Sequence, residues 1–195
     1  MQHCPLRRLS PIVIALTSLV VSCPSAPAES KPQESEDDAQ PKLQILDWEE
    51  SQKLIAGHEG KVVLVDIWTT TCGQCVESFP EFVALHERFK DKEFTCVSVN
   101  CDYDGVQDKP PEFYRPQVTE FLQQQDARFD HILLSVPFID FLDEIKLDST
   151  PAYLLYDAEG RLVRRFDNDA AKTAEDEFSL EDVAEAVGAL VNEAQ

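Results

Sequence analysis

The chain has 195 residues, of which 43% are hydrophobic, and it carries 17 basic against 37 acidic side chains, a formal net charge of -20. This length suits one globular domain with appendages, and the apolar content is ordinary for a folded protein. The acidic balance argues against a phosphate-binding surface, because affinity for nucleic acid depends on Lys and Arg side chains that neutralise phosphates. Six cysteines are too few for a disulfide scaffold of this length, so each is interpreted from its position.

The first 28 residues are predicted to be a secretory signal peptide: two adjacent arginines precede the apolar run 12–21, and small residues lead to Ala28. A run of about ten residues is too short to cross a hydrocarbon core of roughly 30 Å as a helix. Cleavage after Ala28 would release a soluble protein, whereas a lipobox-like sequence ending at Cys23 would leave a lipid-anchored one. Both place the protein outside the cytoplasm; an apolar but disordered N-terminus is the alternative.

Residues 29–42 are acidic and rich in Pro and Ser, without apolar periodicity, which predicts a flexible linker before a folded domain at 43–195. Loss of 1–28 removes two arginines and no acidic residue, so the mature chain carries 15 basic minus 37 acidic side chains, or -22. We therefore expect neutral or basic partner surfaces and association that weakens with salt. A charge that serves solubility alone is the alternative.

Strands and helices are predicted to alternate along the domain, as judged from capping residues, apolar periodicity and β-branched runs. In chain order they are a helix at 48–56, a strand at 61–68, a helix at 72–89, a strand at 94–100, a helix at 118–128, a strand at 132–135, a helix at 138–145, strands at 153–156 and 162–166, and a helix from about 179 to 192. The polar, Pro-containing stretch 102–116 predicts a loop. This order indicates an α/β fold with a central mixed sheet, helices on both faces, and a C-terminal β-hairpin and helix.

The clearest chemical signal is Cys72-Gly-Gln-Cys75, which follows the predicted strand 61–68 and opens a predicted helix. Free backbone N–H groups and the helix dipole stabilise a thiolate at such a helix start, so Cys72 should be a nucleophile near neutral pH. Cys75 lies one helical turn further on and can attack a mixed disulfide formed on Cys72. The pattern therefore favours thiol–disulfide exchange.

A zinc half-site and a purely structural disulfide are the alternatives for this pair. Zinc needs a second pair of ligands, for which only Cys96 and Cys101 are candidates, and the four histidines form no ligand-spaced cluster. A structural disulfide is compatible with export, but so short a loop constrains the unfolded chain little. The order of strand, Cys-x-x-Cys and helix favours the redox interpretation.

The segment 65–68 (Val-Asp-Ile-Trp), the Cys-Gly-Gln-Cys motif, Pro80 and the distant Thr150-Pro151 together resemble the thioredoxin-like superfamily. The stretch 153–163, with the helix and strand that precede Thr150, is similar to the exported TlpA/ResA-type thiol–disulfide oxidoreductases of that superfamily. The likeness covers roughly 43–193. It implies a thioredoxin-like fold and an extracytoplasmic enzyme that reduces disulfides in exported proteins without a metal or other cofactor.

The resemblance also implies roles for individual residues. Cys72 would attack and Cys75 would resolve, so that the two form a redox-active disulfide. Asp66, on a buried strand, would take the proton of Cys75, and burial should raise its pKa toward neutrality, unless it faces solvent. Pro151 would be a cis-proline facing the disulfide, with the Thr150 backbone holding an extended substrate; a trans proline that opens a strand is the alternative.

Four further residues are implied as active-site support: Trp68, which packs beside the active-site loop or fills the core, and Thr71, Gly73 and Gln74. The superfamily commonly has Trp before the first cysteine and Pro before the second, where this chain has Thr71 and Gln74. Residues at these positions tune the reduction potential, so the direction of electron flow stays open. Ser78 stands where TlpA/ResA-type proteins usually carry Glu, which leaves proton handling to Asp66.

Cys96 and Cys101 lie on and at the end of one predicted strand, where they would face opposite sides about 16 Å apart and cannot form a disulfide with each other. Cys96 is expected to be a core residue. Cys101 falls at the carboxyl edge of the sheet, where ligand sites collect, and is either buried and inert or an extra thiol near Cys72.

The implied partners are a disulfide-bearing exported client protein and a membrane or soluble thiol electron donor, with no nucleic acid and with membrane contact only through a lipid at Cys23. Two other functions stay open. A peroxiredoxin-like thiol peroxidase is suggested by Thr69, three residues before Cys72, but Val65 stands where that site has Pro. A non-enzymatic module that binds or delivers Cu(I) would use the two cysteines of the motif as soft ligands.

Overall fold

The computed structural model describes residues 41–173 and 176–193. The predicted signal segment 1–28 and the linker up to residue 40 lie outside them. Six strands form one sheet: β1 (Lys42–Leu46), β2 (Val62–Trp68), β3 (Phe94–Asn100), β4 (Asp130–Leu134), β5 (Ala152–Tyr156) and β6 (Leu162–Phe166). The helices are α1 (Trp48–Ala56), α2 (Gly73–Phe89), α3 (Pro111–Gln124), α4 (Phe138–Ile145) and α5 (Leu180–Glu193).

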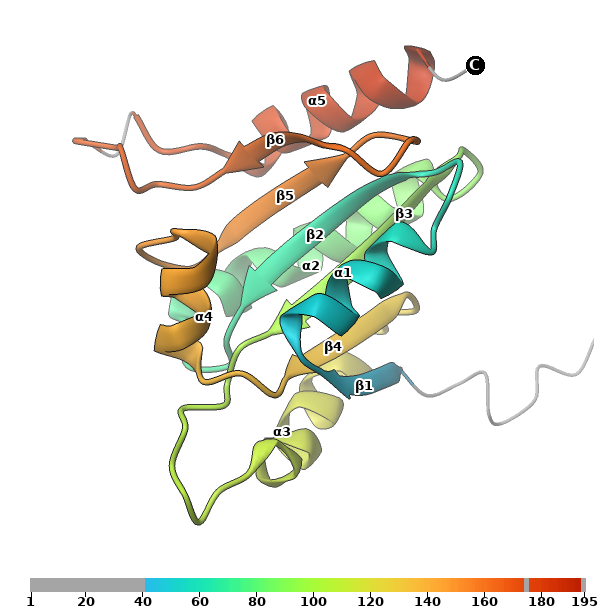
Figure 1. Cartoon of the computed structure of the whole chain (residues 1–195). Coiled ribbons are helices and arrows are strands. Elements are labelled where there is room, and N and C mark those ends of the chain that lie inside the picture. Colours follow the sequence, from blue (N-terminus) through green and yellow to red (C-terminus); the bar gives the residue numbers. More distant parts are fainter. Residues whose placement is uncertain (1–40, 174–175, 194–195) are drawn as a thin grey trace, which may run out of the picture. The chain divides into compact units, whose positions relative to one another are not determined.

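The sheet is mixed, with strand order β1-β4-β3-β2-β5-β6 (Figure 1). Strands β1, β4, β3 and β2 are parallel, β5 runs antiparallel to β2, and β6 runs antiparallel to β5. Helices α2, α3 and α5 cover one face, where Phe79, Val118 and Val187 share a core cluster. Helices α1 and α4 cover the other face through Trp48 and Phe141. The predicted α/β fold with helices on both faces is confirmed.

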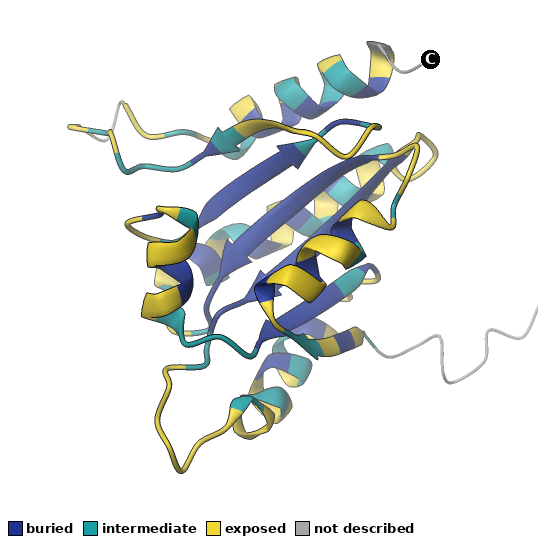
Figure 2. Ribbon diagram, in the orientation of Figure 1, coloured by how far each residue is buried: buried dark blue, intermediate teal, exposed yellow. Residues whose placement is uncertain are grey.

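Strand β2 lies at the centre of both cores, and all seven of its residues are buried (Figure 2). Because side chains alternate along a strand, Leu64 and Trp68 enter the core under α2, whereas Val65 and Ile67 enter the core under α1 and α4. Asp66 belongs to the α2 side by the same alternation. The strand therefore carries a carboxyl group into the apolar layer beneath α2.

Two elements differ from the sequence-based expectation. Strand β1 was not predicted, and Lys42, which was assigned to the linker, is its first residue. The strand has five residues, and its one buried side chain, Leu43, stands between exposed Lys42 and Gln44, so its alternation is too short to be distinctive.

Helix α3 spans Pro111–Gln124 and not the predicted 118–128. The early start is possible because Pro111 occupies the first helical position, where the backbone N–H has no helical partner and a proline costs nothing. The early end follows from Asp126, whose backbone is left-handed with φ 50° and cannot continue a helix. Because the prolines of the stretch 102–116 favour a loop, the sequence predicts a helix that begins too late in the chain.

A fully buried histidine, His131 of β4, forms two hydrogen bonds across the sheet layer. Its Nδ1 lies 2.7 Å from the Ser98 hydroxyl oxygen, and its Nε2 lies 3.2 Å from the Ala127 carbonyl oxygen. Burial lowers the pKa of His131 from 6.5 to about 4, because the charged ring would lose its hydration. The folded protein therefore holds this ring neutral.

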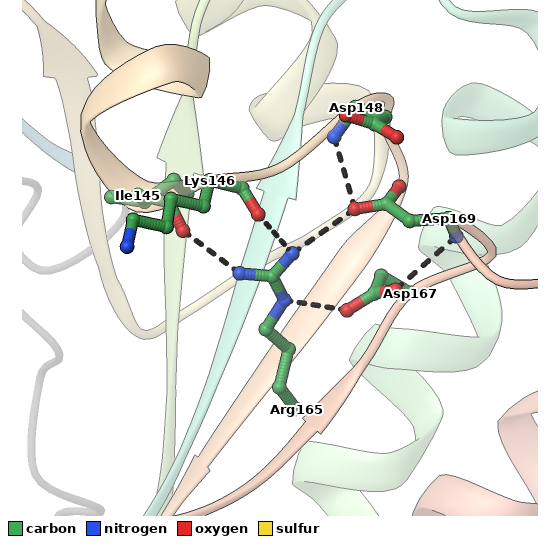
Figure 3. A network of polar contacts seen from close by, with 6 residues as sticks. All are labelled: Ile145, Lys146, Asp148, Arg165, Asp167 and Asp169. Carbon is green, nitrogen blue, oxygen red and sulfur yellow. Dashed lines mark hydrogen bonds and ion pairs between the residues drawn. The ribbon is translucent and has the colours of Figure 1, made fainter.

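Arg165 of β6 joins three segments of the chain (Figure 3). Its guanidinium donates to the carbonyl oxygens of Ile145 and Lys146 at the end of α4, and it pairs with Asp167 and Asp169. The Asp169 carboxylate also accepts the backbone N–H of Asp148 at 3.0 Å. This network fastens the connection between α4 and β5 to the segment that follows β6.

Acid should destabilise the fold through His131. Below pH 6.5 the unfolded chain binds a proton at this histidine that the folded chain excludes, so stability falls until the pH reaches about 4. Between pH 7 and pH 4 the wild type should lose about 3 kcal/mol more stability than His131→Leu, as measured by urea unfolding. Equal losses in the two proteins would contradict a neutral buried ring.

Arg165→Met should lower the free energy of unfolding by about 3 kcal/mol, because two partly buried carboxylates lose their cation and two carbonyls at the end of α4 lose the guanidinium as donor. The control is Arg164→Met, which removes an exposed guanidinium that lies 4.3 Å from the centre of the Phe166 ring. That change should cost less than about 1 kcal/mol. Urea unfolding of both variants measures these changes. Equal losses in the free energy of unfolding would mean that the network contributes little to stability.

Candidate active site at the start of helix α2

The cysteine motif stands where β2 leaves the sheet and α2 begins. Cys72 is the N-cap residue of α2, with extended backbone, and its Sγ accepts the backbone N–H of Cys75 at 3.1 Å. The Thr69 hydroxyl oxygen accepts the backbone N–H of Cys72 at 3.1 Å and so shapes the turn. A sulfur in this position faces the free N–H groups and the positive end of the helix dipole, which favour a thiolate.

Cys72 and Cys75 form a disulfide, with their Cα atoms 5.2 Å apart. The two sulfurs differ in access: Cys72 is partly exposed, whereas Cys75 is 1% exposed and belongs to the core under α2. A substrate can therefore approach Cys72 from solvent, and Cys75 can be reached only from Cys72.

The Thr150-Pro151 peptide bond is cis and lies beside the disulfide. The Thr150 carbonyl oxygen is 3.6 Å from Cys72 Sγ, and Pro151 is buried. Thr150 lies in the α4–β5 connection that Arg165 fastens. The two segments expected from sequence to form the site, 78 residues apart at Cys72 and Thr150, do meet.

Asp66 is 1% exposed on the α2 side of β2, and its Oδ1 has no hydrogen-bond partner among the described residues. Burial alone raises the pKa of this carboxyl group well above its ordinary value, because no cation compensates the loss of water. The raised pKa agrees with the expectation from sequence, and exposure of Asp66 to solvent is excluded. A carboxyl group with a raised pKa is a stronger base than an exposed one, which suits proton transfer to or from a thiol.

The loop between β2 and α2 is anchored by Asp102, a residue that the sequence analysis did not single out. Its carboxylate accepts the Thr70 backbone N–H at 2.7 Å and the Thr70 hydroxyl at 2.6 Å. Gln117 of α3 donates to the same hydroxyl oxygen at 2.7 Å. The available signal was the position of Asp102 just after β3, at the carboxyl edge of the sheet next to the end of β2.

The residues expected as active-site support occupy two environments. Trp68 is fully buried, with its ring 4.8 Å from that of Phe79 and 4.9 Å from that of Phe121, so it fills the core under α2 and α3. Thr71, Gly73 and Gln74 are exposed around Cys72.

A small open cavity lies beside the disulfide between α2, β5 and the segment before α5. Its volume is about 150 Å³. Aromatic, aliphatic and polar residues line it together: Gln74, Ser78, Glu81, Pro151, Tyr153, Asn168, Phe178 and Leu180. Pro151, the residue of the cis peptide bond, is one of these lining residues, so the cavity adjoins the cis-proline.

Cys96 and Cys101 are free thiols in separate cores. Cys96 lies in the core under α2 and Cys101 in the core under α1 and α4, and burial raises the pKa of both well above the ordinary value. The expectation that they face opposite sides is confirmed. Cys101 is 1% exposed and on the face opposite to the Cys72 cluster, so the alternative of an extra thiol beside Cys72 is wrong.

Within 41–173 and 176–193, no three His, Cys, Asp or Glu side chains gather in a group that could hold a metal ion. In that same part of the chain, none of the helices combines the length and the apolar character needed to cross a membrane.

Solved structures from several bacteria have a similar fold. The thioredoxin domain of a thiol-disulfide oxidoreductase from Bacteroides vulgatus is 24% identical, with a TM-score of 0.50 over 70% of this chain and 83% of that one. A thiol:disulfide interchange protein, DsbE, from Chlorobium tepidum is 24% identical, with a TM-score of 0.51 over 72% and 84%. An exposed lipoprotein thioredoxin from Streptococcus pneumoniae is 18% identical, with a TM-score of 0.50 over 70% and 90%.

A curated relative is the chloroplastic protein SUPPRESSOR OF QUENCHING 1 of Arabidopsis thaliana, 25% identical over 126 residues. The match covers 60% of this chain but 11% of that protein, so the chain corresponds to a small part of it.

The family model described as Redoxin matches residues 35–184, which include the cysteine motif, the buried Asp66 and the cis-proline. With its thioredoxin-like sheet and its Cys72–Cys75 disulfide, the chain belongs to the Redoxin family.

Proposed function

We propose that this protein is an extracytoplasmic thiol–disulfide oxidoreductase that reduces disulfides in exported proteins. The observation that carries the proposal is the unequal access of the two sulfurs: Cys72 is open at a helix start and Cys75 is buried behind it. This asymmetry suits an attacking and a resolving thiol. A purely structural disulfide has no need of it.

In the reduced enzyme the Cys72 thiolate would attack one sulfur of a client disulfide. A bond forms between Cys72 Sγ and that sulfur, the client S–S bond breaks, and the second client sulfur leaves as a thiolate that takes a proton. The Thr150 carbonyl, 3.6 Å from Cys72 Sγ, borders the space for the client backbone, and the cavity lined by Gln74 and Pro151 would take a neighbouring client side chain.

Cys75 would then resolve the mixed disulfide. Its thiol loses a proton to the Asp66 carboxylate, and the resulting thiolate attacks Cys72 Sγ, so that the first client sulfur leaves and the Cys72–Cys75 disulfide forms. The raised pKa of Asp66 makes it a base of suitable strength for a thiol. A membrane or soluble dithiol donor would return the pair to the reduced state.

An extracytoplasmic location is supported by the signal-like residues 1–28 and by the exposed lipoprotein thioredoxin among the similar structures. The acidic chain suggests client or donor surfaces that are neutral or basic.

Cys75→Ser should accumulate a mixed disulfide with client proteins, because the attacking thiol remains while the resolving one is lost. The measurement is non-reducing electrophoresis after acid quenching, followed by release of the partner with a reductant. Cys72→Ser is the matched control and should trap nothing, since its remaining thiol is buried. If Cys72→Ser traps clients and Cys75→Ser does not, the two roles are reversed.

The reduction potential of the Cys72–Cys75 pair should lie close to that of thioredoxin, roughly -270 mV, if the protein is a reductant. Equilibration with glutathione or dithiothreitol buffers, read by thiol alkylation, gives the value. A potential near -120 mV, typical of a strong oxidant, would contradict the proposed direction while keeping the exchange chemistry.

A further inference from the structure

Asp66 is one member of a row of buried polar side chains that crosses the sheet under α2. In the strand register it stands opposite Tyr153 of β5 and opposite Ser98 of β3, and Ser98 stands opposite His131 of β4. Residues in register on neighbouring strands share a face of the sheet, with the strands about 4.8 Å apart. Ser98 is therefore the polar side chain next to Asp66 on that side.

The direction of the hydrogen bonds in this row follows from His131. The Ala127 carbonyl oxygen, 3.2 Å from Nε2, can only accept, so Nε2 carries the ring proton. Because the ring is neutral, with a pKa of about 4, Nδ1 is then an acceptor. The Ser98 hydroxyl at 2.7 Å must be the donor to Nδ1, and its single proton points away from Asp66.

On the other side of Asp66, the Tyr153 hydroxyl also has a hydrogen-bond partner. The Tyr153 hydroxyl lies 3.5 Å from the Ser78 hydroxyl of α2, and the Ser78 hydroxyl lies 3.2 Å from the Cys75 carbonyl oxygen. Both neighbours of Asp66 in the row thus form their side-chain hydrogen bonds with groups other than its carboxyl group.

The remaining groups around Asp66 supply no cation. In α2 and in the described parts of α3 and α5, every fully buried side chain is apolar or belongs to the Cys72–Cys75 disulfide. His86 of α2 is half-buried, and burial lowers its pKa, which favours the neutral ring. The titratable groups near Asp66 are neutral thiols, a phenol and the neutral imidazole: Cys96 and Cys101, Tyr153 and His131, with Cys75 held in the disulfide.

We propose that Ser98 and His131 are positioning residues that hold Asp66 in its protonated form in the oxidised protein, the form that Asp66 takes once it has accepted the proton of Cys75. Because His131 takes the Ser98 proton, only the lone pairs of that hydroxyl remain for Asp66, and a lone pair can accept a proton from a carboxylic acid but cannot stabilise a carboxylate.

The functional meaning of this arrangement rests on the proposed exchange reaction. When a donor thiolate attacks Cys72 Sγ in the oxidised protein, the disulfide bond breaks and its electron pair goes to Cys75 Sγ. A protonated Asp66 can deliver its proton to that buried sulfur, so the product is a thiol and not a buried thiolate. The hydrogen-bond row thus prepares the oxidised protein to be reduced.

The test is a titration of the Asp66 carboxyl carbon by NMR in the oxidised protein, in which Cys75 does not titrate. His131→Leu frees the Ser98 hydroxyl to donate to the carboxylate, so the midpoint should fall by about one pH unit, a tenfold change in the ratio of the two forms. In a Ser98→Ala background the same His131→Leu change should leave the midpoint where Ser98→Ala alone puts it. An unchanged midpoint in His131→Leu, or equal shifts in both backgrounds, would overturn the proposal.

A measurement on the wild type needs no variant to fold. The ¹⁵N spectrum of the His131 ring should show the proton on Nε2, and a proton on Nδ1 would refute the assigned direction. Both readouts concern the resting oxidised protein. They can succeed while client trapping by Cys75→Ser fails, and the reverse, so the two proposals fail separately.

Discussion

Strand β2 has hydrogen-bonded strands on both edges and packed helices on both faces, and none of its side chains reaches solvent. The position of this strand determines where the two cysteines of the motif and the cis-proline lie. Its last residue leads into the turn that puts Cys72 at the start of α2, and its antiparallel neighbour β5 begins just after Pro151. A strand that is held on four sides cannot shift, so the two cysteines and the cis-proline keep their separation.

Because β2 is buried, the carboxyl group of Asp66 lowers the stability of the fold. A carboxyl group in an apolar layer is tolerated in its neutral form or with a donor, and the sheet supplies no donor through hydrogen bonds that are already committed elsewhere. The fold gives up some stability at this position, since a Leu or Val would pack there without penalty. Such a local conflict between a residue and its surroundings is typical of sites kept for chemistry.

How much the sequence could reveal depended on how local each feature is. Cys72 and Cys75 form a helix start within four residues, so their spacing and the strand before them were sufficient. Thr150-Pro151 was found through a family motif, because nothing in the local sequence says which strand it faces.

Asp102, Arg165 and the Ser98–His131 pair were not found, and all of them act across elements. The hydrogen bonds that they form between elements join residues 19 to 33 positions apart, and these pairings exist only once the strand register is set. Helix α3 was misplaced for a different reason. Its Pro111 stands at the first position, where a proline is harmless, but Pro116 stands inside the helix, where a proline is unfavourable and so favours a loop in a sequence-based prediction.

The separation of Cys96 and Cys101 into two opposite cores has a consequence for biogenesis. In an oxidising compartment four thiols of one domain can pair in six ways, and five of those pairings include at least one of these two cysteines. Once the sheet has formed, neither thiol can reach another cysteine or a solvent oxidant. The order of events therefore matters: a chain that folds before it is oxidised has one disulfide open to it, whereas a chain oxidised too early can be trapped with a central strand tied to the wrong partner.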